Sequence, residues 1–240
     1  MAVDEVLHSK KSYKNTVVND SVFVYPLDNI FLLCYYKQHK LRNIRYFKNK
    51  VRKMPPKFKF TKDEIISAAL NLVRKNGMSA LTARALAEEL GCSVKPIFGL
   101  FKNMDELQQA VFSAAQNLYQ SYLQDSVSKG EYPTYKSAGM AYIRFAKEEK
   151  ELFKLLFMRD RRNEKIEENR EDVRQFIDLI MQKLGINEDE AYMFHLEMWI
   201  YVHGIATMLA TSYLEWSNEL IDKTLTDMFL GLKSRYSPKE

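Results

Sequence analysis

Hydroxyl and lysine side chains stand at the starts of two short segments with helical periodicity within residues 81–101. Thr82 is spaced to cap the first segment and Ser93 the second. Their hydroxyls, with the free backbone amides beside them, can therefore bind anionic oxygens. Lys95 follows closely, and a lysine can donate to O6 and N7 of guanine. The chemistry that these residue types support is recognition of phosphates and base edges.

A tight turn joins the two segments. Ala85, Leu86 and Leu90 form the apolar face of the first segment. Gly91 follows at once, and a residue without Cβ accepts a positive φ there at little cost. Pro96 lies in the first turn of the second segment, where a missing N–H loses no intrahelical hydrogen bond. Two short helices joined in this way predict a helix-turn-helix, whose second helix enters the major groove of DNA.

The surrounding sequence resembles the head of the TetR/AcrR family of transcriptional regulators over about residues 58–110. Its features are an Ala-Ala pair within residues 64–78, an Ala-Leu-Ala-Glu second helix, Gly then Ser at the turn, a PIFGLF ending, and an Asn-Met-Asp-Glu-Leu start to the next helix. The resemblance implies a three-helix DNA-binding head on a helical body that dimerises and senses ligands.

Two departures from the family pattern affect this head. Family members often carry a phosphate-binding Tyr where this chain has Phe98 and a Lys where it has Met104, and Lys102 is the candidate to replace that charge. The basic residues would hold phosphates, Lys95 would read a base edge, and the apolar residues would fit the groove. A solvated surface side chain is the alternative for each. The predicted contacts are Lys59, Lys62, Thr82, Arg84, Ser93, Val94, Lys95, Pro96, Phe98, Gly99 and Lys102.

The charge of the chain is distributed unevenly. Residues 54–104 carry eight Lys/Arg and four Asp/Glu, a net of +4, whereas residues 105–240 carry 17 and 23, a net of −6. A basic head on an acidic body directs the head toward phosphates. We therefore expect the affinity for DNA to fall steeply with salt.

Residues 1–53 form a basic N-terminal extension of different composition. No acid lies between Asp28 and Asp63, while eleven Lys/Arg run from Lys37 to Lys62. No helical or alternating period persists in the extension, which predicts disorder. Two interpretations stand side by side: translation naturally starts at Met54 and the extension is a start-site artefact, or the extension is a basic arm that follows DNA phosphates.

Beyond residue 53 the chain reads as all-α. Six prolines and eight glycines are few for its length, which favours long helices. About nine helices are predicted, divided between a head of residues 54–104 and a ligand-binding and dimerisation domain of residues 105–240. Their expected bounds are 63–76, 82–90, 93–100, 103–127, 134–148, 150–158, 164–183, 188–213 and 217–235.

The last two predicted helices are candidates for a subunit interface. Residues 189–216 are apolar almost all round, and Gly204, Ala206 and Ala210 would let another helix approach closely. Residues 217–235 carry a single apolar stripe. TetR-like proteins dimerise through a four-helix interface of this kind. The resemblance therefore implies a homodimer that binds a palindromic operator with half-sites about one helical turn apart.

Trp199, His203 and Gly204 resemble the Trp…His-Gly signature of a TetR subgroup with a WHG-type C-terminal domain, over about residues 140–235. The candidate lining of an effector pocket is Tyr119, Tyr142, Phe145, Phe157, His195, Trp199 and His203. The alternative is that these side chains are core and that His203 makes one buried hydrogen bond. His195 and His203 lie ~12 Å apart along a helix, too far to share an ion. Neither a metal nor a cofactor is predicted.

The remaining features narrow the function. The sequence has no nucleophile elbow, no phosphate-cradling glycine loop and no clustered triad, so no enzyme is predicted. Two cysteines cannot form a disulfide framework, which fits a cytoplasmic protein, and residues 22–36 are too interrupted to cross a membrane. The predicted function is a DNA-binding transcriptional regulator, chiefly a ligand-responsive repressor acting as a homodimer on double-stranded DNA. The alternative is an effector-independent architectural DNA-binding protein.

Overall fold

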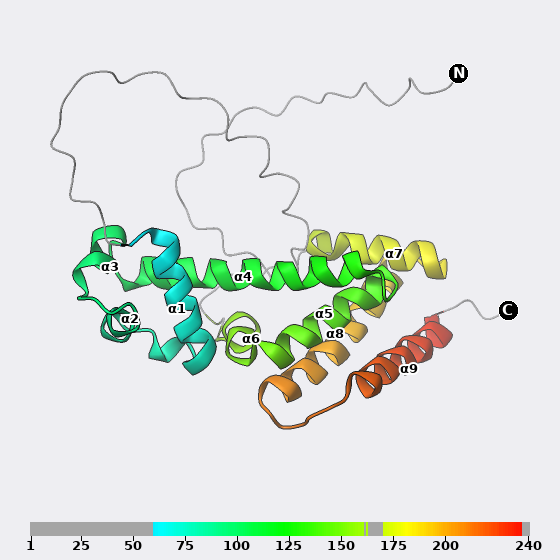
Figure 1. Ribbon diagram of the computed structural model, residues 1–240. Coiled ribbons are helices and arrows are strands. Elements are labelled where there is room, and N and C mark those ends of the chain that lie inside the picture. Colours follow the sequence, from blue (N-terminus) through cyan, green and yellow to red (C-terminus); the bar gives the residue numbers. More distant parts are fainter. Residues whose placement is uncertain (1–59, 161, 163–169, 237–240) are drawn as a thin grey trace, which may run out of the picture.

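The computed structural model describes residues 60–160, 162 and 170–236, and every regular element in those ranges is helical (Figure 1). This confirms the predicted all-α class. The interpretations of residues 1–53 and of Lys59 lie outside the described residues. The α-helices are α1 (Lys62–Asn76), α2 (Ala83–Glu89), α3 (Lys95–Leu100), α4 (Met104–Lys129), α5 (Thr134–Glu148), α6 (Lys150–Phe157), α7 (Arg174–Leu184), α8 (Glu188–Ala210) and α9 (Asn218–Tyr236), with short 3₁₀ turns η1 (Met78–Ala80) and η2 (Arg170–Val173).

Local capping defines the head helices α1 and α2. The hydroxyl of Thr61 accepts from the Glu64 amide at 3.2 Å, and the Glu64 carboxylate accepts from the Thr61 amide at 2.7 Å, which completes a capping box. Thr82 caps α2 in the predicted way, by accepting from the Ala85 amide at 3.1 Å. Gly91 takes a φ of 59°, the left-handed conformation expected at the turn.

The start of α3 differs from the prediction. Ser93 was expected to cap it, but the helix begins at Lys95 and its N-cap residue is Val94, with no side-chain hydrogen bond. Val94 already has nearly helical torsions, φ −67° and ψ −16°, and Pro96 fixes φ in the first turn. The backbone torsions of Val94 and Pro96 are therefore sufficient to start α3 without a side-chain hydroxyl cap.

The long helix α4 runs from the head into the body (Figure 1). It begins at the predicted cap, where the Asn103 side chain accepts from the Glu106 amide at 2.9 Å. Its buried residues fall on one stripe because they recur every four positions or so, and they pack against α1, α5 and α6. The buried residues are Leu107, Val111, Ala115, Tyr119 and Leu123.

The body packs around α5 and α8. One cluster of buried residues continues from the head through α4, α5, α6 and α8 to Ile221 and Leu225 of α9. A second, smaller cluster joins α7 to α8 and to the end of α9, around Phe176, Ile177 and Phe194. The core is thus divided in two, and α7 belongs only to the smaller part. The predicted domain boundary after residue 104 coincides with the first turn of α4 and stays a prediction.

Two later helices have different bounds from those expected. The helix expected over 164–183 corresponds to α7, which begins at Arg174 after η2, and residues 163–169 lie outside the described ranges. The helix α8 ends at Ala210 instead of residue 213. Ser212 takes a φ of 56°, and such a left-handed residue ends the helix.

Candidate functional site

The outer face of α3 carries apolar side chains that the fold leaves in solvent. Ile97 is fully buried and fixes the helix on the head. Val94 and Phe98, one helical turn apart, remain 39% and 45% exposed. Lys95 and Gly99 lie on the same exposed surface, and Pro96 is half-buried. A short helix with such a mixed face has the residue types needed to contact thymine methyl groups and guanine edges.

The cations around α3 differ in how far they are already engaged. Arg84 and Lys95 are exposed and form no ion pair with another described residue. Thr82 is exposed too, and its hydroxyl keeps a proton to donate while it caps α2. Ser93 and Lys102 are exposed at the two ends of α3. These groups surround the outer face of the helix and could reach phosphates on either side of a groove.

Lys62 is tied to the body instead of standing free. Its ammonium lies 2.9 Å from the Glu106 carboxylate and 4.9 Å from the centre of the Phe101 ring. The Glu106 carboxylate also accepts from the backbone amide of Lys102, and this bond, followed by the one from Lys62, lowers the pKa of Glu106. Lys62 could therefore bind a phosphate only in competition with α4.

A cavity of about 690 Å³ opens in the body, with walls from α4, α5, α7, α8 and α9. It lies between the two core clusters, because Tyr142 and Val202 on one side belong to the larger and Phe176 and Ile180 on the other to the smaller. The predicted residues Tyr119, Tyr142, His195 and Trp199 line it. The predicted residues Phe145, Phe157 and His203 do not.

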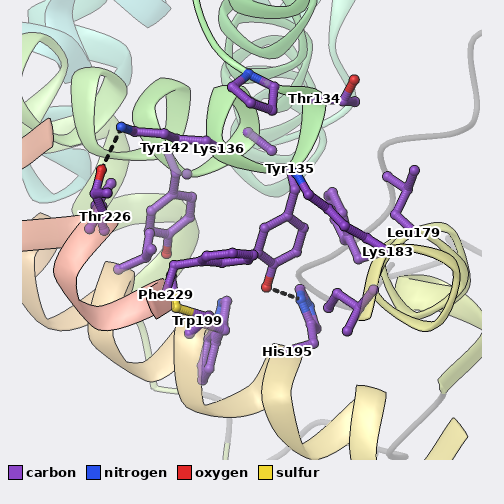
Figure 2. A pocket seen from close by; sticks show the side chains of 18 of the residues that line it. Thr134, Tyr135, Lys136, Tyr142, Leu179, Lys183, His195, Trp199, Thr226 and Phe229 are labelled. Carbon is purple, nitrogen blue, oxygen red and sulfur yellow. Dashed lines mark hydrogen bonds between the residues drawn. The ribbon is translucent and has the colours of Figure 1, made fainter. Parts of the chain in front are cut away.

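A tyrosine–histidine pair bridges α5 and α8 at the floor of the cavity. The Tyr135 hydroxyl lies 3.1 Å from Nδ1 of His195, whose ring stacks on Phe176 with centroids 5.1 Å apart (Figure 2). Burial lowers the pKa of His195 to about 4 and raises that of Tyr135. Both groups are therefore uncharged near neutral pH, and they offer hydrogen bonds without net charge.

A second tyrosine–histidine pair lies about two helical turns further along α5 and α8. The Tyr142 hydroxyl is 2.8 Å from Nδ1 of His203, and the His203 ring stacks on Trp199 with centroids 5.2 Å apart. Burial lowers the pKa of His203 as well. His203 thus makes a partly buried hydrogen bond, and it contacts Tyr142 and Trp199 of the cavity wall.

Aromatic contacts extend from the cavity wall toward the head. The ring of Tyr142 lies 4.8 Å from Phe157 and 5.2 Å from Phe153, both on α6. The helix α6 in turn packs against α1. At the same junction the Arg74 guanidinium of α1 donates to the buried Glu149 carboxylate at 2.7 Å. The helix α6 therefore contacts both the cavity wall and the head.

Several lining residues had no signal in the sequence. Tyr135 and Lys136 come from the first turn of α5, and Leu179 and Lys183 come from α7. The chain around α7 reads as an ordinary amphipathic helix, so nothing in its pattern indicates which face covers a cavity. The one available signal was the repeat of tyrosine at 135 and 142 against histidine at 195 and 203.

The described part of the chain contains neither a cluster of metal-ligating side chains nor a membrane-spanning helix. No three His, Cys, Asp or Glu side chains there come together in a way that could hold a metal ion. None of the helices in those residues is both long and apolar enough to span a lipid bilayer.

Comparison with family models gives two matches. Residues 65–111 match the model of bacterial regulatory proteins of the tetR family, and residues 135–230 match the tetracyclin repressor-like, C-terminal domain. Together these matches cover more than half of the chain, and they include both α3 and most of the cavity wall. No curated protein matches the chain.

Several solved structures are similar to this chain at low sequence identity, and the one from Rhodococcus shares its fold. A protein of unknown function from Rhodococcus sp. RHA1 is 19% identical, with a TM-score of 0.54, and the alignment covers 78% of this chain and 100% of that one. A TetR family protein from Vibrio parahaemolyticus is 17% identical, with a TM-score of 0.49 and coverage of 74% and 99%. SmeT, the repressor of the Stenotrophomonas maltophilia multidrug efflux pump SmeDEF, is 14% identical, with a TM-score of 0.44 and coverage of 76% and 93%.

Proposed function

This chain belongs to the tetR family of bacterial regulatory proteins, and from that membership we propose that it is a homodimeric repressor which a small molecule releases from its operator. Members of the family regulate transcription by binding DNA and are not enzymes. The specific proposal concerns three parts of the molecule: the outer face of α3, the exposed faces of α8 and α9, and the cavity between them and α7.

The observation that carries DNA binding is the exposed face of α3. Val94 and Phe98 are apolar yet lie in solvent, beside the Lys95 cation, which forms no ion pair with a described residue. Apolar side chains in such positions are available to a partner surface, and the major groove offers thymine methyl groups and acceptor edges. Arg84 and Thr82 are placed to hold the phosphates next to the groove.

Dimerisation is supported by apolar side chains that α8 and α9 leave exposed. Ile200 of α8 is 57% exposed and Leu230 of α9 is 54% exposed, and Met193 lies two turns before Ile200 on the same face. Two copies that bury these faces against each other would carry two heads. A palindromic operator with half-sites about one helical turn apart fits such a pair.

The ligand response is supported by the position of the cavity. Its wall touches α6 through the ring contacts of Tyr142 with Phe153 and Phe157, and α6 packs on α1 of the head. A ligand can change the affinity for DNA only if it binds the released state better than the DNA-bound state. A molecule that fits the cavity only after the Tyr142 wall has moved would meet this condition, and α6 would transmit the movement to the head.

The first test addresses α3 with the full chain. Duplexes that the protein binds are selected from a random-sequence pool, and the affinity of Lys95→Ala for the selected duplex is measured at fixed salt. We expect a loss of roughly 1–3 kcal/mol, because the substitution removes a base-edge contact. Lys129→Ala, which removes an exposed lysine at the far end of α4, is the matched control. Equal affinities for the two variants would contradict the role of α3.

A further inference from the structure

The walls of the cavity carry positive but no negative charge. None of the described residues that line it is an aspartate or glutamate, whereas two of them are lysines, Lys136 and Lys183. Most of the remaining surface is apolar, with the rings of Tyr119, Phe176 and Trp199 among it. A cation placed here would lose its hydration without gaining a counter-charge, and this is unfavourable.

The two lysines differ in whether their charge is already compensated. The Lys136 ammonium lies 2.5 Å from the Asp222 carboxylate and donates to the Thr226 hydroxyl at 2.8 Å (Figure 2). Lys183 forms no ion pair with another described residue. Its ammonium lies over the ring of Phe229, 5.9 Å from the centroid. Of the two lysines that line the cavity, Lys183 is thus the one without a counter-charge among the described residues.

Lys183 also stands where a ligand would meet it. Figure 2 shows its side chain extended from α7 into the cavity, on the side opposite to Lys136 and Thr226. The floor below is the uncharged pair of Tyr135 and His195, which can hydrogen-bond to a ligand without opposing a negative head. Aromatic and aliphatic side chains line the space between the two lysines.

We propose that the cavity binds an amphipathic carboxylate, with its apolar body among the aromatic side chains and its anionic head paired with the Lys183 ammonium. The identification of this ligand as the effector rests on the proposed function, whereas its binding does not. Because Lys183 is on α7, which packs chiefly on α8, the ion pair would draw α7 toward α5 and α9 across the seam between the two core clusters. The head group selects the ligand class, and the apolar body supplies most of the affinity.

The test uses probes that differ in head group and in body. Decanoate, decanol and decylamine share one aliphatic body, and naphthoate supplies an aromatic one. Binding to the full chain is measured by calorimetry, with quenching of tryptophan fluorescence in a Trp216→Phe background, where Trp199 is the remaining tryptophan, as a second signal. We expect decanoate to bind at least tenfold more tightly than decylamine. Tighter binding of naphthoate than of decanoate would show that the cavity prefers an aromatic acid. Tighter binding of decanoate would show that it prefers an aliphatic acid.

Substitutions at Lys183 test the ion pair itself. Lys183→Gln should weaken decanoate roughly five- to tenfold and leave decanol unchanged, as loss of a partly exposed ion pair predicts. Lys183→Glu should invert the preference between decanoate and decylamine. Lys129→Gln, an exposed lysine outside the cavity, should leave all probes unchanged. Equal binding of decylamine and decanoate, or no effect of either Lys183 variant on decanoate, would overturn the proposal.

DNA binding is read separately, so that the two proposals can fail independently. Carboxylate binding that depends on Lys183 but leaves the affinity for the selected duplex unchanged would support the ligand class and contradict the ligand response. Release of the duplex by decanoate in the wild type, reduced in Lys183→Gln, would support both. Failure of the protein to bind any duplex would contradict only the proposed function.

Discussion

Single residues in the body owe their chemistry to burial. His195 and His203 are both held by a tyrosine hydroxyl and stacked on an aromatic ring, and burial lowers the pKa of each. The two bonds cross from α5 to α8 two turns apart. They hold together the two helices beside the cavity, and burial keeps both histidines uncharged near neutral pH.

The protonation of His195 makes the stability of the protein dependent on pH. Its pKa is about 4 in the folded protein, against 6.5 for an ordinary histidine. Above pH 6.5 neither the folded nor the unfolded state binds the proton. As the pH falls from 6.5 to about 4, only the unfolded state binds it, so the folded state loses roughly 3 kcal/mol of stability relative to neutral pH.

The measurement compares urea unfolding of the wild type and His195→Gln across that pH window. Glutamine can still accept from the Tyr135 hydroxyl but does not titrate. We expect the variant to lose less stability than the wild type on acidification, whatever its stability at neutral pH. Parallel curves for the two proteins would show that His195 does not titrate in this way.

Among the elements, the contact between α1 and the corner of α5 and α6 joins the head to the body. The Arg74 guanidinium donates to Glu149 at 2.7 Å, and the Glu149 side chain is only 11% exposed. A buried carboxylate needs such a partner, because an unpaired buried charge decreases the stability of the folded state far more than an unpaired surface charge does. The corner is therefore an anchor for the head and not a solvated ion pair.

Loss of this anchor should destabilise the protein. Arg74→Ala leaves the Glu149 carboxylate without its donor, and we expect a decrease of roughly 1–3 kcal/mol in the free energy of unfolding. The neighbouring Lys75 is exposed and forms no ion pair with a described residue, so Lys75→Ala should change the stability by no more than about 0.5 kcal/mol. Urea denaturation of both variants measures the difference. If the two variants are equally stable, the corner contributes no more than the surface does.

On the scale of the whole molecule, the proposed dimer depends on faces that one subunit leaves apolar. Ile200 and Leu230 are exposed on α8 and α9. The heads lie at the other end of α4, so pairing through α8 and α9 would leave both copies of α3 free to reach DNA (Figure 1). The proposed subunit interface and the proposed DNA-binding face are thus separate surfaces.

Substitution of Ile200 by Glu should separate the subunits, because it places a charge in a face that two subunits would bury. We expect a shift from dimer to monomer in sedimentation velocity, together with a large loss of affinity for the selected duplex. Val127→Glu, at an exposed apolar position near the end of α4, is the control and should stay dimeric. A dimer of Ile200→Glu that still binds the duplex would place the interface elsewhere.

The sequence by itself determined the parts of this protein that depend on neighbours along the chain. Thr82, Gly91 and Asn103 predicted the helix starts and the turn correctly, because caps and left-handed glycines act within a few residues. It was wrong at Ser93, where the backbone of Val94 and Pro96 starts the helix without a hydroxyl.

Only the tertiary structure decided which aromatic residues face a cavity and which fill the core. Tyr142 lines the cavity, whereas Phe145 on the same helix is fully buried in the core. Both are aromatic residues, which occur in cores as well as in cavity walls. Lys183 reaches the cavity only because α7 packs over it from far along the chain. Periodicity identifies the buried face of a helix, but the position of a cavity depends on where distant helices fail to meet.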